Sequence, residues 1–234
     1  LQVCVENDNP IFHNNKEVLG IDLGIKNFAV LSNNTFIKGK NVRSIKRKNQ
    51  YLRSKLQSRG TRSARRKLKL LSGQERRFMR DFNHCLSKQI TEMPYGIFAM
   101  EELKGIRNGR KGKVFNRKRS NWAYFQLRQF ISYKAENLGK KLILVDPRYT
   151  SQRCSKCGFI DKANRVGCSF HCLSCDFVCH SDYNASLNIS QIGLILFEQV
   201  DVNQPIVTTN DEVSSLQNIT SDVSYKPTNS LVGN

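Results

Sequence analysis

The 234-residue sequence lacks any long apolar run, which argues against a membrane-spanning protein. Its longest run, Ile192–Phe197, is far shorter than the roughly 20 residues that a spanning helix requires. The N-terminal segment contains neither a basic stretch nor an apolar core, so it does not resemble a secretory signal. The sequence also begins without methionine, and we therefore expect a fragment or a processed chain.

Acidic residues are scarce: 19 Asp and Glu stand against 38 Lys and Arg, for a net charge of +19. This imbalance argues against an ordinary small-molecule enzyme with a neutral surface and favours a polyanionic partner, above all nucleic acid. Residues 38–80 contain 17 basic side chains and a single acid, Glu75, and residues 104–119 add eight more basic side chains. By contrast, residues 191–234 hold five acids and one lysine, and their composition predicts poor order from residue 193 onward.

The basic segments are expected to contact phosphates without reading base sequence, so binding should weaken strongly with salt. The simpler alternative is a solvated face of paired helices, but charge this dense would repel itself without phosphates or acids nearby. The loop at 104–119 follows Glu101 directly and could gate a site there. The side chains expected to bind nucleic acid are Lys46, Arg47, Lys48, Arg53, Arg62, Arg65, Arg66, Lys67, Arg110, Lys111, Arg117, Lys118 and Arg119.

Hydrophobic patterning predicts an α/β fold with a mixed sheet and flanking helices. The strands are expected at 18–22, 28–31, 35–37, 97–100 and 142–145. The helices are expected at 46–91, 121–138 and 183–192. Gly60 and Gly73 should break the first of these into two or three pieces. In the second, Trp122, Phe125 and Phe130 are expected to face the core.

Three carboxylates stand at the ends of separate predicted elements. Asp22 lies in an apolar strand, Glu101 ends the strand at 97–100, and Asp182 opens the last helix. Each alone has a simpler explanation. Asp22 could be an ordinary turn residue, Glu101 could mark the end of a strand in solvent, and Asp182 could stabilise the helix dipole. If the three converge they need a cation, and carboxylate oxygens suit Mg²⁺ or Mn²⁺. Two such ions would activate water and stabilise the leaving oxygen, which predicts metal-dependent phosphodiester hydrolysis.

Six of the eight cysteines lie between Cys154 and Cys179, a spacing that indicates a metal site rather than a disulfide scaffold. Two Cys-x2-Cys knuckles are separated by 14 residues, and four thiolates form the closed shell of a structural zinc ion. The expected ligands are Cys154, Cys157, Cys172 and Cys175. The remaining candidates complete no second knuckle; they are Cys168, Cys179, His171 and His180. Reduced thiols indicate the cytoplasm.

Four segments follow one another in a fixed order: Gly20–Lys26, Glu101–Lys104, Tyr149–Gly158 and Asp182–Ile189. Together they resemble the TnpB (OrfB) proteins of insertion sequences, which look like ancestors of the type V CRISPR effectors. The Gly-Ile-Asp-Leu-Gly segment alone is a weak signal, since it also opens the first phosphate loop of actin-like ATPases. Actin-like ATPases need a second Gly-rich Asp loop, which this sequence lacks. Membership of that class would also not explain the two Cys-x2-Cys knuckles.

The resemblance implies a RuvC-like nuclease domain of the RNase H fold with an inserted, target-binding zinc ribbon. The implied parts are the nuclease domain at 18–148, its basic helical insertion at about 40–92, the zinc ribbon at 149–180, a final RuvC-like helix at 181–192 and a tail at 193–234. Residues 1–17 would end an N-terminal region that binds guide RNA in the family. We expect most of that region to be missing from this chain.

By resemblance, the three catalytic acids fall on Asp22, Glu101 and Asp182, and the second acid is Glu101 and not its neighbour Glu102. The zinc ligands fall on the four knuckle cysteines. The family, long described as transposases, cuts DNA under the direction of a guide RNA. The resemblance therefore implies DNA and guide RNA as partners, structural Zn²⁺ and catalytic Mg²⁺ or Mn²⁺ as cofactors, and a place at the nucleoid of a prokaryote. The alternative is a non-catalytic, basic, zinc-containing remnant that binds nucleic acid.

Overall fold

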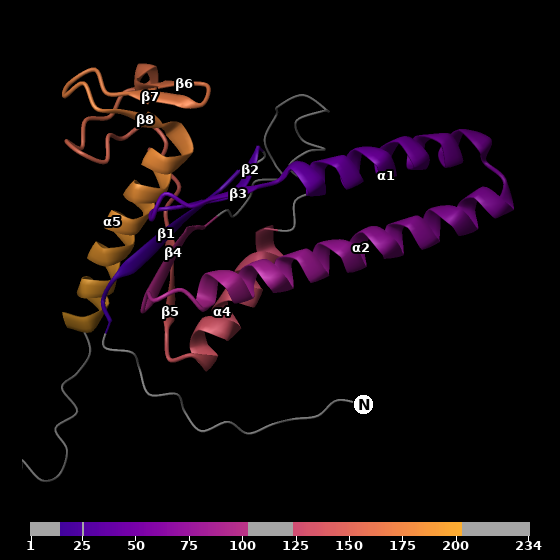
Figure 1. Ribbon diagram of the computed structural model, residues 1–234, viewed down its shortest axis with the longest axis horizontal. Helices are drawn as coiled ribbons and strands as arrows, with labels where there is room; N and C mark the ends of the chain where they lie inside the picture. Colours follow the sequence, from indigo (N-terminus) through magenta and orange to yellow (C-terminus); the bar gives the residue numbers. More distant parts are fainter. Residues whose placement is uncertain (1–14, 25, 103–123, 203–234) are drawn as a thin grey trace, which may run out of the picture. The chain divides into compact units, whose positions relative to one another are not determined.

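The computed structural model describes residues 15–24, 26–102 and 124–202 (Figure 1). One compact unit extends to Glu198, and the fold described below is the fold of that unit. Most of the segment at 1–17, the loop at 104–119 and Trp122 lie outside the described residues. No described helix combines the length and the apolar composition needed to cross a membrane.

A five-stranded mixed sheet forms the centre of the unit, in the order β3-β2-β1-β4-β5. The strands are β1 (Val18–Leu23), β2 (Asn27–Leu31), β3 (Phe36–Lys38), β4 (Ile97–Glu101) and β5 (Lys141–Val145). The first three form an antiparallel meander, whereas β4 pairs in parallel with both β1 and β5. Ile21 of β1 therefore lies between Leu31 of β2 and Met100 of β4. The predicted mixed α/β fold is confirmed.

Helices cover both faces of the sheet, which explains why its central strands are apolar on both sides. The helices are α1 (Lys40–Arg59), α2 (Arg62–Thr91), α4 (Tyr124–Asn137) and α5 (Ser181–Val202). On one face, Ile90 of α2 and Leu127 of α4 share a core with Phe98 of the sheet. Helix α5 covers the other face (Figure 1), where its Ile189 packs with Ala99.

Helix α5 makes direct backbone contact with β1. A Cβ atom on Gly20 would lie 2.0 Å from the carbonyl oxygen of Ser186, so only glycine permits this approach. About two helix turns further along, a Cβ on Gly193 would lie 2.5 Å from the Cβ of Ala99. These contacts set the height of α5 above the sheet and thereby position its first turn, which carries Asp182.

Helices α1 and α2 form a long hairpin (Figure 1). Gly60, with a φ of 63°, ends α1, and the hydroxyl of Thr61 caps α2 by accepting a hydrogen bond from the N–H of Ala64 at 3.2 Å. The break expected at Gly73 was wrong, because Gly73 lies inside α2. Apolar residues continue at helical spacing on both sides of it, and a single internal glycine costs a helix only about 1 kcal/mol.

Two other expectations differ from the structure. Helix α5 continues past Ile192 to Val202, because Ile192 and Leu196 pack against the sheet, so the start of the segment expected to be poorly ordered is helical. Phe125 is 61% exposed rather than in the core, and Phe130 is partly buried. Helix α4 instead buries residues that recur every fourth position, namely Leu127, Ile131 and Ala135.

Residues 149–180, here called the Cys4 module, lie between β5 and α5. The module contains a small antiparallel sheet made of β6 (Arg165–Val166), β7 (Ser169–His171) and β8 (Val178–His180). Phe170, Cys154 and Cys172 form its buried centre. The module lies at the N-terminal end of α5, next to the edge of the large sheet at which β1 and β4 end (Figure 1).

Candidate active site and Cys4 cluster

Asp22, Glu101 and Asp182 line one cavity of about 420 Å³. Asp22 lies near the end of β1 and Glu101 ends β4, and because these strands are parallel, their carboxyl ends meet at the same edge of the sheet. Asp182 reaches that edge from the first turn of α5. Glu102 is not among the residues that line the cavity; the other lining residues are Leu23, Gly24, Lys26, Pro147, Thr150, Ser151, Arg165, Gly167 and Cys168.

Polar partners hold two of the three carboxylates in place. The hydroxyl of Thr150 donates a hydrogen bond to Oε1 of Glu101 at 2.5 Å. Nη2 of Arg165, from β6 of the Cys4 module, lies 3.0 Å from Oδ1 of Asp182, and Nδ2 of Asn27 donates to Oδ2 of Asp182 at 3.2 Å. The acidic site is therefore assembled from the sheet, α5 and the Cys4 module together.

The electrostatics of the cavity favour a bound cation. Burial, followed by the nearby carboxylates of Glu101 and Asp182, raises the pKa of Asp22 from 3.8 to about 8, although Arg165 opposes this shift. Burial also raises the pKa of Glu101, against the hydrogen bond from Thr150 and the charge of Arg165. A divalent ion bound between such carboxylates offsets the repulsion of their negative charges and so favours their ionised form. Carboxylate oxygens are also the ligands that Mg²⁺ and Mn²⁺ prefer.

Sequence reasoning missed three polar residues of this cavity wall and one polar partner of Asp182. Thr150, Arg165 and Lys26 line it, and Asn27 bonds to Asp182. Lys26 could have been found, since it closes the Gly20–Lys26 motif. Arg165 carries no local signal, because it lies between the two knuckles and reaches Asp182 only through the fold of the Cys4 module.

The four knuckle cysteines come together as one cluster whose Sγ atoms all lie within 4.8 Å of one another. The Sγ–Sγ distances are 3.7 Å for Cys154 and Cys175 and 3.5 Å for Cys157 and Cys172. Four sulfur atoms arranged tetrahedrally around zinc at about 2.3 Å would lie roughly 3.8 Å apart. The cluster therefore has the size and the donor atoms of a Cys4 zinc site.

Both knuckles use the same backbone turn. The N–H of Cys154 donates to the carbonyl of Phe159, and the N–H of Cys172 donates to that of Phe177, each at 2.9 Å. The residue after the second cysteine of each knuckle has a positive φ, 81° at Gly158 and 54° at Asp176. The sequence marks this turn only at the first knuckle, where glycine supplies it without strain.

Backbone groups favour a thiolate at the cluster. Burial raises the pKa of the Cys172 thiol, but hydrogen bonds from the N–H groups of Ser174 and Cys175, together with neighbouring thiols, lower it to about 6 overall, while the thiols around Cys175 raise the pKa of that residue, so without metal the cluster favours one thiolate shared among neighbouring thiols. Neither of the two spare cysteines belongs to the cluster: Cys179 is partly buried beside it, and Cys168 accepts a hydrogen bond from Lys26 at 3.4 Å in the wall of the acidic cavity.

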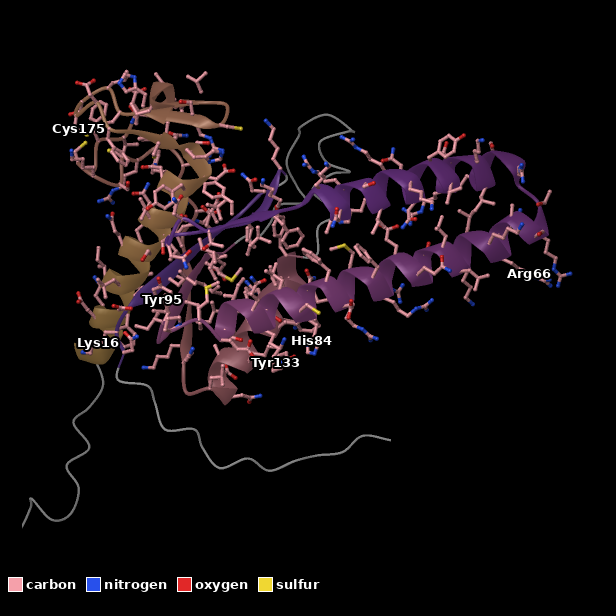
Figure 2. All side chains as sticks on the ribbon, in the orientation of Figure 1. Lys16, Arg66, His84, Tyr95, Tyr133 and Cys175 are labelled. Carbon is pink, nitrogen blue, oxygen red and sulfur yellow. The ribbon has the colours of Figure 1, made fainter. Side chains whose placement is uncertain are left out.

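The basic residues expected to bind nucleic acid fall into three groups. Arg53 of α1 forms a 2.9 Å ion pair with Glu75 of α2. Lys46 of α1 is also near Glu75; burial lowers the pKa of the lysine overall, although the charge of Glu75 raises it. These two side chains therefore help to join the helices. Six others are exposed on the hairpin, where Figure 2 shows Arg66 near the far end: Arg47, Lys48, Arg62, Arg65, Arg66 and Lys67. The last five lie outside the described residues: Arg110, Lys111, Arg117, Lys118 and Arg119.

Two family models match the chain on either side of residues 105–123. The OrfB model of IS605, described as "Probable transposase", matches residues 2–104, which include Asp22 and Glu101. The model described as "Cas12f1-like, TNB domain" matches residues 124–189, which include the Cys4 cluster and Asp182. The boundaries of both matches agree with the positions of the four motifs.

Individual relatives and solved structures agree with these family matches. The chain is 42% identical over 125 residues to the endodeoxyribonuclease Cas12f1 of Sulfoacidibacillus thermotolerans, which covers 50% of this chain and 28% of the relative. It is 26% identical over 230 residues to InsQ of Escherichia coli K12, covering 88% and 57% of the two proteins. It also shares 34% identity over 154 residues with the TnpB-like protein MJ1635 of Methanocaldococcus jannaschii, covering 64% and 35%.

The fold of the chain resembles that of a Cas12f1–sgRNA–target DNA complex, with a TM-score of 0.59 and 23% identity over 81% of this chain and 52% of the other. A Cas12f ternary complex gives a TM-score of 0.61, again at 23% identity, over 81% and 41%. The chain spans between about a quarter and just over half the length of the relatives named above. In its motifs and in these matches, the chain is similar to the TnpB/OrfB proteins of insertion sequences and to their Cas12f relatives.

Proposed function

We propose that the chain is the nuclease part of a TnpB/OrfB-type, RNA-guided DNA endonuclease. In this proposal, residues 18–148 with α5 form a RuvC-like domain of the RNase H fold, and the Cys4 module is a zinc ribbon that binds target nucleic acid. The observation that carries the proposal is the convergence of Asp22, Glu101 and Asp182 in one cavity. The relatives' names, which describe endodeoxyribonucleases, support the same reaction.

The three acids act as oxygen ligands for divalent ions. When bound, two Mg²⁺ ions supply an activated water and a stabilised leaving oxygen for phosphodiester hydrolysis. Thr150 orients Glu101, and Arg165 and Asn27 orient Asp182. The positive charge of Arg165 also lowers the cost of ionising Asp22 and Glu101, which must lose their protons to bind metal.

The exposed basic side chains of the α1–α2 hairpin serve as phosphate contacts for DNA or for a guide RNA. They lie on a helical surface on which few acids offset them, and a charge-dense helix binds phosphate without reading the base sequence. In the longer relatives, the remaining part of the protein would supply the other contacts to the guide.

Mn²⁺ binding to the purified chain tests the proposal, with free Mn²⁺ followed by electron paramagnetic resonance. We expect a site that is lost in Asp182→Asn and in Glu101→Gln but kept in Glu102→Gln, the matched neighbour that does not line the cavity. We also expect Mg²⁺-dependent cleavage of single-stranded DNA that Asp22→Ala abolishes. If nucleic acid binds but no acid-dependent Mn²⁺ site is found, the chain is the non-catalytic remnant instead.

A further inference from the structure

The segment Asp182–Ile189 contains two asparagines, Asn184 and Asn188, that neither metal site uses. They lie one turn apart on α5, so their side chains share one face of the helix. Both are fully buried, with exposed fractions of 0% and 1%. A buried amide destabilises a protein unless it is hydrogen bonded, so the partners of these side chains show what the asparagines hold.

Their partners are backbone groups of the chain that enters the first knuckle. Nδ2 of Asn184 donates to the carbonyl of Arg153 at 2.7 Å, and Oδ1 of Asn184 accepts from the N–H of Ser155 at 3.0 Å. These two bonds bracket Cys154, a member of the Cys4 cluster. Nδ2 of Asn188 donates to the same carbonyl of Arg153 at 2.7 Å and to the carbonyl of Thr150 at 2.8 Å.

The same segment reaches the acidic cavity. Thr150, whose carbonyl Asn188 holds, donates its own hydroxyl hydrogen to Glu101. Asp182 precedes Asn184 by two residues on the same helix, and Arg165 of the Cys4 module bonds to Asp182. Three hydrogen bonds, joined through the covalent frame of Thr150, therefore connect the Arg153–Cys154 peptide group to Glu101 by way of Asn188.

We propose that Asn184 and Asn188 are positioning residues that couple the Cys4 cluster to the carboxylate site. Occupation of the cluster by zinc then fixes the knuckle backbone, which places Thr150 and thus Glu101 relative to Asp182. This inference rests on the proposed function, because it requires that both sites bind metal. Such coupling is reciprocal, so occupation of either site strengthens binding at the other.

The test uses the full 234-residue chain with Co²⁺ as the probe of the cluster and Mn²⁺ as the probe of the acids. In Asn188→Ala, we expect the thiolate–Co²⁺ charge-transfer band to persist, while the Mn²⁺ affinity falls about 10- to 100-fold, as for other residues that orient metal ligands. Ser190→Ala is the matched control. It removes a 2.7 Å hydrogen bond from the same helix to the carbonyl of Val18 in β1, away from the knuckle, and should leave Mn²⁺ affinity unchanged.

Zinc removal gives a second measurement. Chelation of the cluster metal should weaken Mn²⁺ binding in the native chain by at least this factor, because Arg165 is also released from Asp182, and should weaken it by less in Asn188→Ala. If Asn188→Ala does not fold, Asn188→Leu keeps a similar side-chain size and removes the donor without adding a charge. Unchanged Mn²⁺ affinity in the Asn188 variant, or equal loss in Ser190→Ala, overturns the coupling. Absence of Mn²⁺ binding in the native chain overturns the proposed function instead, and the coupling with it.

Discussion

Arg165 forms a 3.0 Å ion pair with Asp182, which joins a side chain of the Cys4 module to an acid of the cavity. Both side chains are largely removed from solvent, at 33% and 15% exposed. The arginine also faces the other two acids, since its charge opposes the upward pKa shifts of Asp22 and Glu101. Arg165 therefore places positive charge beside all three carboxylates in the metal-free chain.

Replacing Arg165 should weaken metal binding in a manner that depends on pH. In Arg165→Gln, the pKa values of Asp22 and Glu101 rise further, so protons compete with Mn²⁺ up to a higher pH. At neutral pH we expect about tenfold weaker Mn²⁺ binding, recovered as the pH is raised. Titrations of Mn²⁺ at several pH values measure this, and Arg148→Gln, an exposed arginine paired with Asp146, is the control. A uniform loss at every pH would contradict the electrostatic explanation.

The metal-free chain should become less stable as pH rises from about 4 to about 8. The pKa of Asp22 is about 8 in the folded chain and near its ordinary 3.8 when unfolded. Between these values the folded state binds the extra proton, so the free energy of unfolding falls with pH by about 1.4 kcal/mol per unit for one such group. Urea unfolding in the presence of a chelator measures the slope.

Two comparisons check that this pH slope comes from the acids. Asp22→Asn should flatten it, although the raised pKa of Glu101 leaves a part of it in place. Saturating Mg²⁺ should restore stability at pH 8, because the ion binds the folded, ionised site. A stability that increases with pH in the native, metal-free chain would be incompatible with the pKa of Asp22.

Loss of one knuckle cysteine should remove the cluster metal. In Cys157→Ser, the tetrahedral thiolate shell is incomplete, and we expect the bound zinc to be lost along with the cooperative unfolding of the Cys4 module. Zinc content and thermal unfolding measure this. Cys85→Ser is the control, since Cys85 is exposed on α2 and lies outside the cluster. Equal zinc content in the two variants would show that the four thiols do not act together.

Exposed arginines of the hairpin should contribute to nucleic-acid affinity through phosphate contacts. Arg66→Gln should weaken binding to every DNA sequence alike and reduce the slope of log K against log salt by about 0.7–0.9. Lys88→Gln is the matched control, since Lys88 is an exposed cation of the same helix that is paired with Glu92. Fluorescence anisotropy at several salt concentrations measures both, and equal slopes for the two variants would mean that Arg66 contacts no phosphate.

Much of the local structure could be predicted from the residues. The strands at the positions of Asp22 and Glu101, the existence of the helices and the two knuckles were predicted correctly, because apolar spacing and Cys-x2-Cys motifs are local patterns, but α1 begins six residues earlier and α5 ends ten residues later than expected. The errors were also local. Gly73 does not break α2, and Phe125 faces solvent, because the packing of Leu127 and Ile131 overrides the simple count of aromatic residues.

The convergence of the acids could be expected from parallel strand ends and from the family resemblance, but their partners could not. Arg165, Thr150 and Asn27 reach the acids through long-range contacts that leave no periodic trace in the sequence. The role of Asn184 and Asn188 likewise appears only when α5 is packed against the knuckle. Residue type and spacing thus specify which groups are available, whereas burial and register between distant segments determine which of them share a site.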